Sequence, residues 1–246
     1  MKNLRFGLLS VLFFLTMIIA GCATNGDSGT SAFKNSSAKQ ILLGGETALA
    51  KADYSTAIKH FEALDSLYPF GDEAKQAKID IIYAYYKNDD YAPALAAADR
   101  YIHLYPRDEV VPYAYYMKGL VGLESNRTAL QKLFNRNLAE LDLSGLRSSF
   151  STFNELVQQY PDSIYAKDAH RCMIYIRNTF AEHELQTANF YFDRKAYVAA
   201  LNRAIYIVKH LNGSPQVAEA LQLMQKSYQA LGEQKKANDI AQLLKK

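Results

Sequence analysis

The chain has 246 residues, of which 49% are hydrophobic and 22% are charged, and its formal net charge is +3. This apolar fraction is sufficient for a sizeable core, and the length allows one or two ordinary domains. The near-balance of 28 basic and 25 acidic residues gives no reason to expect a nucleic-acid partner.

Residues 1–21 are predicted to be a lipoprotein signal peptide. Lys2 and Arg5 precede the apolar run Phe6–Ala20, which is too short for a transmembrane helix and typical of a signal peptide. The run ends in Ile-Ala-Gly-Cys, which resembles the lipobox of bacterial lipoproteins. We therefore predict cleavage between Gly21 and Cys22, with a diacylglyceryl thioether and an N-acyl chain on Cys22. The alternative is an ordinary secretory signal followed by an incidental cysteine.

The residue after the cysteine predicts the location of the protein. By resemblance to the usual sorting pattern, Ala23 favours the outer membrane of a Gram-negative cell, where two or three acyl chains would anchor the chain stably on the periplasmic face. Cys172, the second of two cysteines, is then left without a partner and is expected to be a small buried hydrophobic residue on a helix, the alternative being a reactive thiol. Residues 22–37 are small and polar without a period, which predicts a flexible, lipid-anchored tether.

From residue 38 onward, a helical pattern recurs at a basic interval of 37 residues. A small residue is followed by packing residues four and seven positions later and, in the first three copies, by a proline. This is the signature of the second helix of a tetratricopeptide (TPR) unit, in which the small residue allows close helix packing and the proline ends the helix. The copies begin at Ala57, Ala94, Ser149, Ala200 and Ala237. The predicted fold is all-α, an α-solenoid of about five TPR helix pairs.

Two intervals between the copies exceed the repeat length. Ser149 follows Ala94 by 55 residues, 18 more than the period, which predicts an insertion at 123–145. Such an insertion is either a contact site or a tolerated loop, and the sequence favours neither. Ala200 follows Ser149 by 51 residues, 14 more than the period, so an overlong helix is expected at Ser163–Arg194.

No motif in the sequence indicates catalysis. There is no Walker loop and no G-x-S-x-G pattern, and His183-Glu184 lacks the second histidine of a zinc-protease motif. The five histidines are scattered along the chain, which does not predict a metal site. We therefore expect a non-enzymatic protein with no cofactor besides its lipid, acting through surfaces that bind other proteins.

The expected binding surface lies on the first helices of the units, which line the inner groove of TPR arrays. Residues 38–122 cover the first two units and the first helix of the third, and are expected to bind a substrate peptide; residues 146–246 are expected to dock stable partners. An aromatic and aliphatic groove suits a peptide with apolar side chains, although the same residues could equally pack on the next unit. The groove residues are Leu42, Glu46, Leu49, Ile79, Tyr83, Tyr86, Tyr116, Leu120 and Leu123, with Tyr68 and Phe70 at the break between the first two units.

Several stretches resemble the BamD family of outer-membrane assembly lipoproteins. They are FEALDSLYPFG, IDIIYAYYKNDDY, YYMKGL, ALQKLF, LVQQYPDSIYAKDA and AYVAALNRAI, in that order. The resemblance covers residues 38–211 and is most specific at Tyr68–Gly71 and Asp80–Asn88.

The resemblance implies a subunit of the β-barrel assembly (BAM) machine, which inserts β-barrel proteins into the outer membrane around the barrel protein BamA. It implies that the N-terminal repeats recognise unfolded barrel proteins and that the later repeats dock the membrane-proximal POTRA domain of BamA. Arg203, in the stretch AALNRA, matches a family arginine that contributes to this docking. BamC and BamE are further partners of the family in some species. The alternative is another periplasmic TPR lipoprotein, a scaffold for cell-wall synthesis or a secretion pilot.

Overall fold

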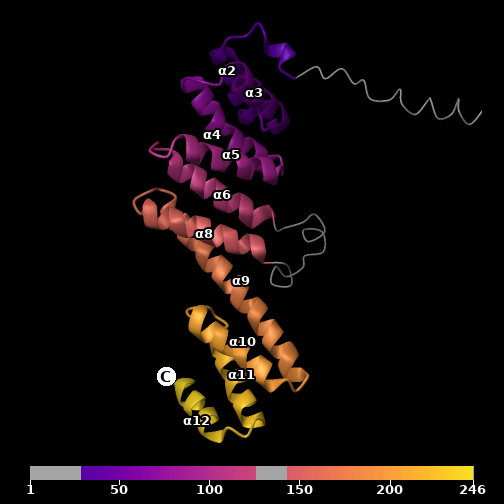
Figure 1. The fold of residues 1–246 in the computed structure, drawn as a ribbon, viewed down its shortest axis with the longest axis vertical. Coiled ribbons are helices and arrows are strands. Elements are labelled where there is room, and N and C mark those ends of the chain that lie inside the picture. The colour runs from indigo at the N-terminus through magenta and orange to yellow at the C-terminus, as the bar shows by residue number, and fades with distance from the viewer. Residues whose placement is uncertain (1–28, 126–142, 246) are drawn as a thin grey trace, which may run out of the picture.

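The computed structural model describes residues 29–125 and 143–245, which contain ten α-helices, one short 3₁₀ helix and no strand. The α-helices form five consecutive pairs within these residues. The pairs are α2 (Ala38–Ala50) with α3 (Tyr54–Leu67), α4 (Asp72–Lys87) with α5 (Tyr91–Leu104), α6 (Val111–Ser125) with α8 (Ser144–Gln159), α9 (Ala166–Asp193) with α10 (Tyr197–His210), and α11 (Val217–Ala230) with α12 (Gln234–Leu243). Each pair stacks on the next in an elongated array (Figure 1), which confirms the predicted α-solenoid.

One type of turn joins the two helices in units 1, 2, 4 and 5; the corresponding turn of unit 3 lies outside the described residues. The N–H before each second helix donates to the carbonyl five residues earlier, at 2.9–3.0 Å, as in a Schellman motif. The preceding residue has a positive φ: Ala52 (57°), Asp89 (61°), Lys195 (62°) and Gly232 (77°). Three of these turns therefore keep a non-glycine residue in a conformation that glycine adopts more readily, because the paired helices fix the backbone there.

Glycines allow the two helices of units 1 and 3 to approach closely. A Cβ on Gly45 would lie 2.4 Å from the ring of Phe61, and a Cβ on Gly119 would lie 2.4 Å from the ring of Phe153. Unit 2 reverses the sizes, with Ile82 at the glycine position and Ala98 at the phenylalanine position, both fully buried. A large side chain on one helix is therefore matched by a small one on the other, which keeps the core filled.

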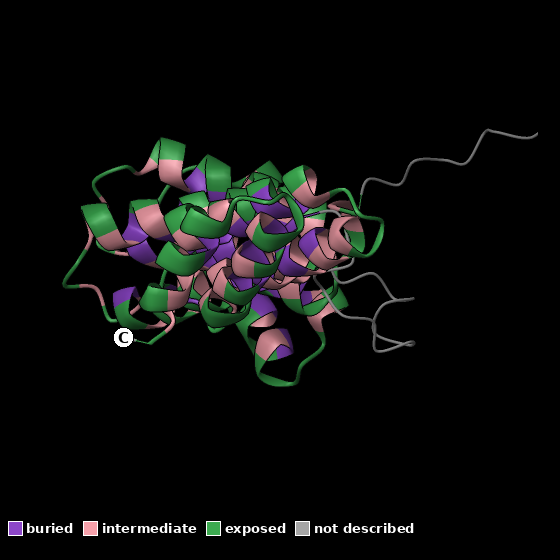
Figure 2. Ribbon diagram, turned by 90° about the horizontal axis from the view of Figure 1, so that it is seen from below, coloured by how far each residue is buried: buried purple, intermediate pink, exposed green. Residues whose placement is uncertain are grey.

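The core runs the length of the array as four clusters of buried side chains, each of which joins one helix pair to the next. Figure 2 shows the buried residues on the helix sides that face neighbouring helices. The clusters are centred on Phe61 and Leu64, on Ile82 and Tyr101, on Phe153 and Leu156, and on Ala204 and Ile207. These residues belong to the predicted repeat pattern, except Ile82, which lies on the first helix of unit 2.

Three boundaries differ from the sequence prediction. The overlong helix is present, but it begins at Ala166 because Ser163 and Tyr165 form a turn before it. Helix α6 continues to Ser125 and α8 begins at Ser144, so 123–125 and 143–145 belong to the repeat framework, and the rest of the predicted insertion lies outside the described residues. The third difference concerns the predicted tether.

The end of the predicted tether is packed against unit 1. Ser31–Phe33 forms the 3₁₀ helix η1, and the Phe33 ring lies edge-on to His60 with 4.7 Å between ring centroids. The Tyr68 hydroxyl donates to the Ser36 carbonyl at 2.9 Å, and Ser37 forms a capping box with Gln40 at the start of α2. The prediction of an unpacked segment is therefore wrong for residues 31–37. Apolar Phe33, in an otherwise polar stretch, was the sequence signal.

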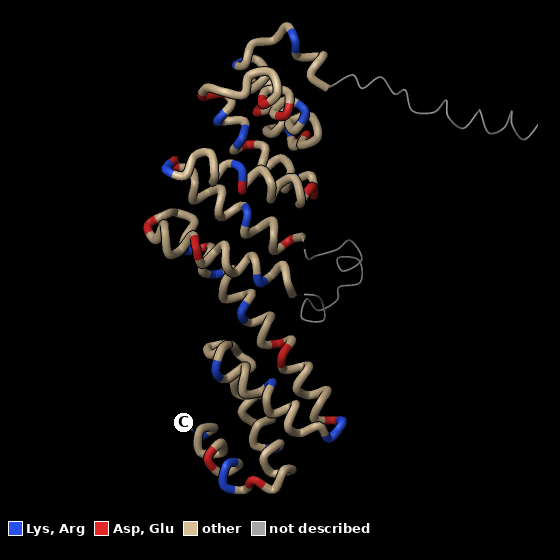
Figure 3. Tube along the Cα trace, in the orientation of Figure 1, with Lys and Arg blue, Asp and Glu red and all other residues tan. Residues whose placement is uncertain are grey.

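Acidic and basic side chains alternate along the array without segregating to one end (Figure 3). Local ion pairs, rather than one charged face, therefore determine the electrostatics of each surface.

Candidate functional site

The predicted groove residues of units 1 and 2 do not form one open surface. Leu42 and Leu49 are half-buried and pack against the first core cluster, whereas Glu46 is exposed. Ile79 is only 5% exposed, so most of its side chain serves packing, although it also lines a pocket beside Asp80 and Asp108. Its side chain joins the core between α4 and α6. Because adjacent helices lie close together here, the side chains on their inward-facing positions pack against one another.

The tyrosines of α4 combine packing with partial exposure. Tyr83 is 37% exposed and lies edge-on to Tyr54, with 6.2 Å between ring centroids. Tyr86 is half-buried against the α4–α6 core. Tyr83 therefore remains accessible to a ligand on this face, whereas Tyr86 mainly stabilises the contact with α6.

The predicted groove residues of unit 3 form the joint between α6 and the fourth unit. The Tyr116 hydroxyl donates to Asp168 at 2.5 Å, and its ring stacks on Tyr165 with 5.2 Å between centroids. Leu120 and Leu123 are half-buried against the cluster formed by α8 and α9. These side chains connect consecutive units, which is the packing alternative that the sequence left open.

Tyr68 and Phe70 lie in the break between α3 and α4. The Tyr68 ring is 37% exposed although its hydroxyl is held by Ser36, and Phe70 is 89% exposed. Gly71, with a φ of 101°, turns the chain into α4 directly after Phe70. This break therefore presents an aromatic surface to solvent at the edge of unit 1.

A pocket of about 410 Å³ lies between α3, α4 and α5 on the face of α4 opposite to the predicted groove. We call it the α3–α5 pocket. Space is left here because α5 contributes small residues where a larger side chain would fill it, and the floor of the pocket is apolar. The floor consists of Phe61, Ala77, Ile81, Ala97 and Tyr101, and Ala96 and Pro93 lie at its edge. No predicted site residue lines this pocket, because the predicted groove residues of α4 lie on the other face of that helix.

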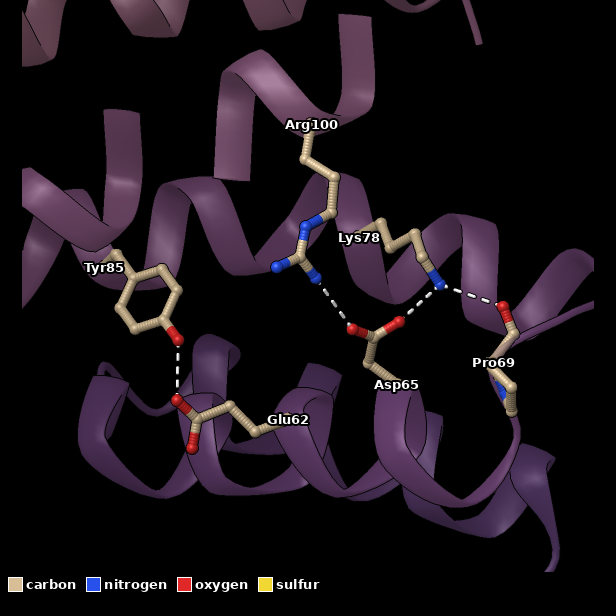
Figure 4. Close-up of polar contacts among 6 residues, drawn as sticks. All are labelled: Glu62, Asp65, Pro69, Lys78, Tyr85 and Arg100. Carbon is tan, nitrogen blue, oxygen red and sulfur yellow. Dashed lines mark hydrogen bonds and ion pairs between the residues drawn. The ribbon is translucent and has the colours of Figure 1, made fainter. Parts of the chain in front are cut away.

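The rim of the α3–α5 pocket carries a network of polar side chains (Figure 4). Asp65 accepts from Lys78 at 2.6 Å and from Arg100 at 3.1 Å, and Lys78 also donates to the Pro69 carbonyl at 3.0 Å. Separately, the Tyr85 hydroxyl donates to Glu62 at 2.6 Å. Burial and this hydrogen bond raise the pKa of Tyr85, so its hydroxyl stays a neutral donor.

A second pocket of about 410 Å³ lies between α4, the α5–α6 loop and Tyr165, and it holds two aspartates with opposite pKa shifts. Burial raises the pKa of Asp80, whose carboxylate accepts two hydrogen bonds from Gln76. Burial also acts to raise the pKa of Asp108, but contacts from Lys75, the Val110 N–H and the Tyr101 hydroxyl outweigh it and lower the pKa. Asp108 therefore ties α4, α5 and α6 together as a carboxylate.

Arg203 lies where α8, α9 and α10 surround a hollow of about 550 Å³. Its side chain is 47% exposed and forms an ion pair of 3.1 Å with Glu184, which is 16% exposed. Arg147 of α8, whose guanidinium lies over the Phe180 ring, also lines the hollow. The hollow presents two arginines and one acid with apolar and amide neighbours, which suits an acidic protein surface.

Gly21 and Cys22 lie outside the described residues. Within the described ranges, no helix is long and apolar enough to cross a membrane, and no group of three or more metal-ligating side chains is present. Cys172 is half-buried and forms no disulfide, and burial raises the pKa of its thiol.

These features define a helical-repeat protein whose candidate sites are hollows between helices, suited to binding other proteins. A family model described as YfiO, outer membrane lipoprotein, matches residues 34–243. The chain belongs to this family of outer membrane lipoproteins.

Named relatives agree with the family match. The chain is 36% identical to the outer membrane protein assembly factor BamD of Vibrio cholerae, over 93% of each chain. It is 33% identical to the protein of the same name from Haemophilus influenzae, over 95% of this chain and 87% of the relative. Among solved structures, the MamA protein matches 83% of this chain and 88% of its own at 11% identity and a TM-score of 0.37, which is too low to support an argument.

Proposed function

We propose that the protein is a lipid-anchored subunit of the BAM complex, which binds unfolded β-barrel proteins near its first units and docks BamA through the surface around Arg203. Membership in the outer membrane lipoprotein family and the BamD relatives support the role in outer membrane protein assembly. The role is one of binding and positioning, and no step of it requires catalysis.

The lipid anchor is assigned to Cys22. The acylated cysteine would hold the array at the periplasmic face of the outer membrane. Because the tether keeps the binding surfaces near the membrane, weak contacts with unfolded substrates are sufficient for capture. Mass spectrometry of the mature N-terminus tests the assignment, since acylation at Cys22 would disappear in a Cys22→Ser variant.

Substrate capture is assigned to the aromatic surface at the first two units, which includes Phe70, Tyr68 and Tyr83. Phe70 supports this assignment, because a phenylalanine that is 89% exposed beside a second aromatic ring offers apolar contact area without any rearrangement. A photo-crosslinker in place of Phe70 should capture unfolded β-barrel proteins, and one in place of exposed Lys226 on α11 should not.

The observation that carries the docking assignment is the hollow beside Arg203. The arginine keeps about half of its side chain exposed while Glu184 fixes its position, so its remaining N–H groups are available to an acidic partner. BamA should co-purify in detergent with the tagged wild-type protein. Arg203→Glu should lower its recovery at least tenfold, because it places like charges together across the interface.

A matched control separates docking from a general effect of charge. Lys209 lies exposed on the same helix and does not line the hollow, so Lys209→Glu should recover BamA as the wild type does. Recovery of BamA with Arg203→Glu would overturn the docking surface. No recovery with the wild type would overturn the proposed membership of the complex, provided that thermal melting shows all proteins to be folded.

A further inference from the structure

The α3–α5 pocket has the form of a binding site that is separate from the proposed docking surface. Its volume of about 410 Å³ is within the range of ligand pockets, and its floor includes the buried rings of Phe61 and Tyr101. Neither Arg203 nor the exposed aromatic residues Tyr68, Phe70 and Tyr83 line it. A ligand here would therefore be bound independently of both assignments made above.

The rim of the pocket has two ends of opposite charge. At one end, Asp65 neutralises only one of its two cationic neighbours, Lys78 and Arg100. At the other end, Glu62 accepts from the neutral Tyr85 hydroxyl and forms no ion pair within the described residues. Glu62 and Asp65 are three residues apart on α3, so the two ends lie on one helix face, as Figure 4 shows. The carboxylate of Glu62 is therefore held in position without an ion-pair partner among the described residues.

Comparison with the next unit shows that the α3–α5 pocket lacks a basic side chain paired with Glu62. One repeat of 37 residues further on, the position of Glu62 is occupied by Asp99, and the position of Ile81 is occupied by Lys118. Lys118 and Asp99 form an ion pair of 2.6 Å. In the α3–α5 pocket, the equivalent of that lysine is the apolar Ile81, which contributes to the floor. The protein thus supplies the cation at one junction and leaves the equivalent carboxylate without one at the other.

We propose that the α3–α5 pocket binds an extended segment of a protein partner that places an apolar side chain on the floor and a basic side chain beside Glu62. The basic group replaces the cation that Lys118 supplies one unit later. The unused N–H groups of Arg100 are available to backbone carbonyls of the same segment. In an extended segment, side chains two residues apart face the same side, so a Phe-x-Lys sequence presents both groups together.

The experiment uses fluorescein-labelled ten-residue peptides and fluorescence anisotropy with the mature protein. The parent peptide contains one Phe-x-Lys in a Gly-Ser background, and two others carry Phe-x-Glu or Ala-x-Lys. The parent peptide should bind at least tenfold more tightly than the Ala-x-Lys peptide and at least threefold more tightly than the Phe-x-Glu peptide. Equal binding of all three would overturn the proposal.

Two variants with matched controls locate the site on the protein. Ala96→Phe fills the pocket from an exposed position and should weaken binding at least tenfold, whereas Ala92→Phe, on the same helix outside the pocket, should not change it. Glu62→Gln keeps the acceptor for Tyr85 and removes the charge, so it should cost about three- to fivefold, as expected for an exposed ion pair. Glu155→Gln, an exposed acid on α8, should bind as the wild type does.

The outcomes distinguish this site from the proposed function. If Ala96→Phe and Glu62→Gln both bind the parent peptide like the wild type, the peptide is bound elsewhere and the proposal is wrong, while the recovery of BamA through Arg203 is unaffected. If both variants weaken binding and still recover BamA normally, the pocket is a separate site. Circular dichroism and melting temperatures of the variants exclude unfolding as the cause of lost binding.

Discussion

The first two units and the fourth unit are built on the same turn but differ in the length of the first helix. In unit 2, α4 has 16 residues and contacts its immediate neighbours α2, α3, α5 and α6. In unit 4, α9 has 28 residues and contacts α8 at one end and both α10 and α11 at the other, running diagonally between them in Figure 1. The short helix α4 therefore contacts the helices stacked around it, whereas the long helix α9 forms a continuous connection between two parts of the array.

This difference determines how the candidate sites are related. The α3–α5 pocket depends on three neighbouring helices of ordinary length. The hollow at Arg203 instead depends on α9, because Glu184 in the C-terminal half of this helix fixes the arginine and Asp168 near its N-terminal end bonds to Tyr116 of α6. A rigid helix thus connects the docking surface to the third unit, and local changes in units 1 and 2 should leave that connection intact.

The largest expected effect comes from the buried rings that face glycines in units 1 and 3. Phe61→Ala and Phe153→Ala should each lower the free energy of unfolding by about 3–5 kcal/mol, because each leaves a cavity opposite a glycine that cannot fill it. Chemical denaturation monitored by circular dichroism measures the change. Hydrogen exchange should show the loss of protection centred on α2 and α3 for the first variant and on α6 and α8 for the second. A uniform loss over all helices in both variants would contradict separate local cores.

A smaller effect should be confined to the loop between units 2 and 3. Asp108→Asn should cost about 1–2 kcal/mol at pH 7, because the amide loses the charge that holds Lys75, Tyr101 and the Val110 N–H. The folded-state pKa of Asp108 lies below its ordinary value of 3.8, so the stabilisation is present above that pH and is lost as the pH falls through the folded-state pKa.

The equivalent loop of the C-terminal half provides the control. Ser214 occupies the position after unit 4 that Asp108 occupies after unit 2. Its buried hydroxyl has no hydrogen-bond partner among the described residues. Ser214→Ala should therefore leave the stability unchanged or raise it slightly, independently of pH. Denaturation curves between pH 3 and pH 7 compare the two variants, and an equal pH dependence in both would contradict the role given to Asp108.

The smallest effect tests the turn that both regions have in common. Ala52→Gly in unit 1 and Lys195→Gly in unit 4 should each raise the free energy of unfolding by about 0.5–1 kcal/mol, because glycine adopts the positive φ with less strain. Gly232→Ala in unit 5 should lower it by a similar amount. Opposite signs for the first two variants would show that the turns are not equivalent.

The sequence allowed the repeat framework to be predicted because its pattern is local. The small residues Ala57, Ala94 and Ala200 are all fully buried, and the glycine positions Gly45 and Gly119 oppose equivalent phenylalanines. The overlong helix followed from simple counting between repeats. Boundaries were less certain, because the end of α6 and the start of α9 depend on turn contacts rather than on apolar spacing.

The candidate sites were less predictable because they depend on which side chains meet between units. Ile79 was expected in a groove and is part of the core, since the contact with α6 decides its burial. The α3–α5 pocket arises from the small residues Ala96 and Ala97 on α5 facing α3, which no single-helix pattern indicates. Arg203 was singled out only by family resemblance, and its partner Glu184 lies 19 residues earlier on another helix.

The packing of Phe33 against unit 1 limits how far the array can move from its anchor. With a lipid on Cys22, the chain to Phe33 has 11 residue steps and can extend to at most about 40 Å. Phe33 is fixed to α2 and α3, so the aromatic surface of unit 1 stays in a layer a few nanometres deep beneath the bilayer. If the protein captures unfolded chains as proposed, those encounters would take place within that layer, and their frequency would depend on the surface density of the protein on the membrane.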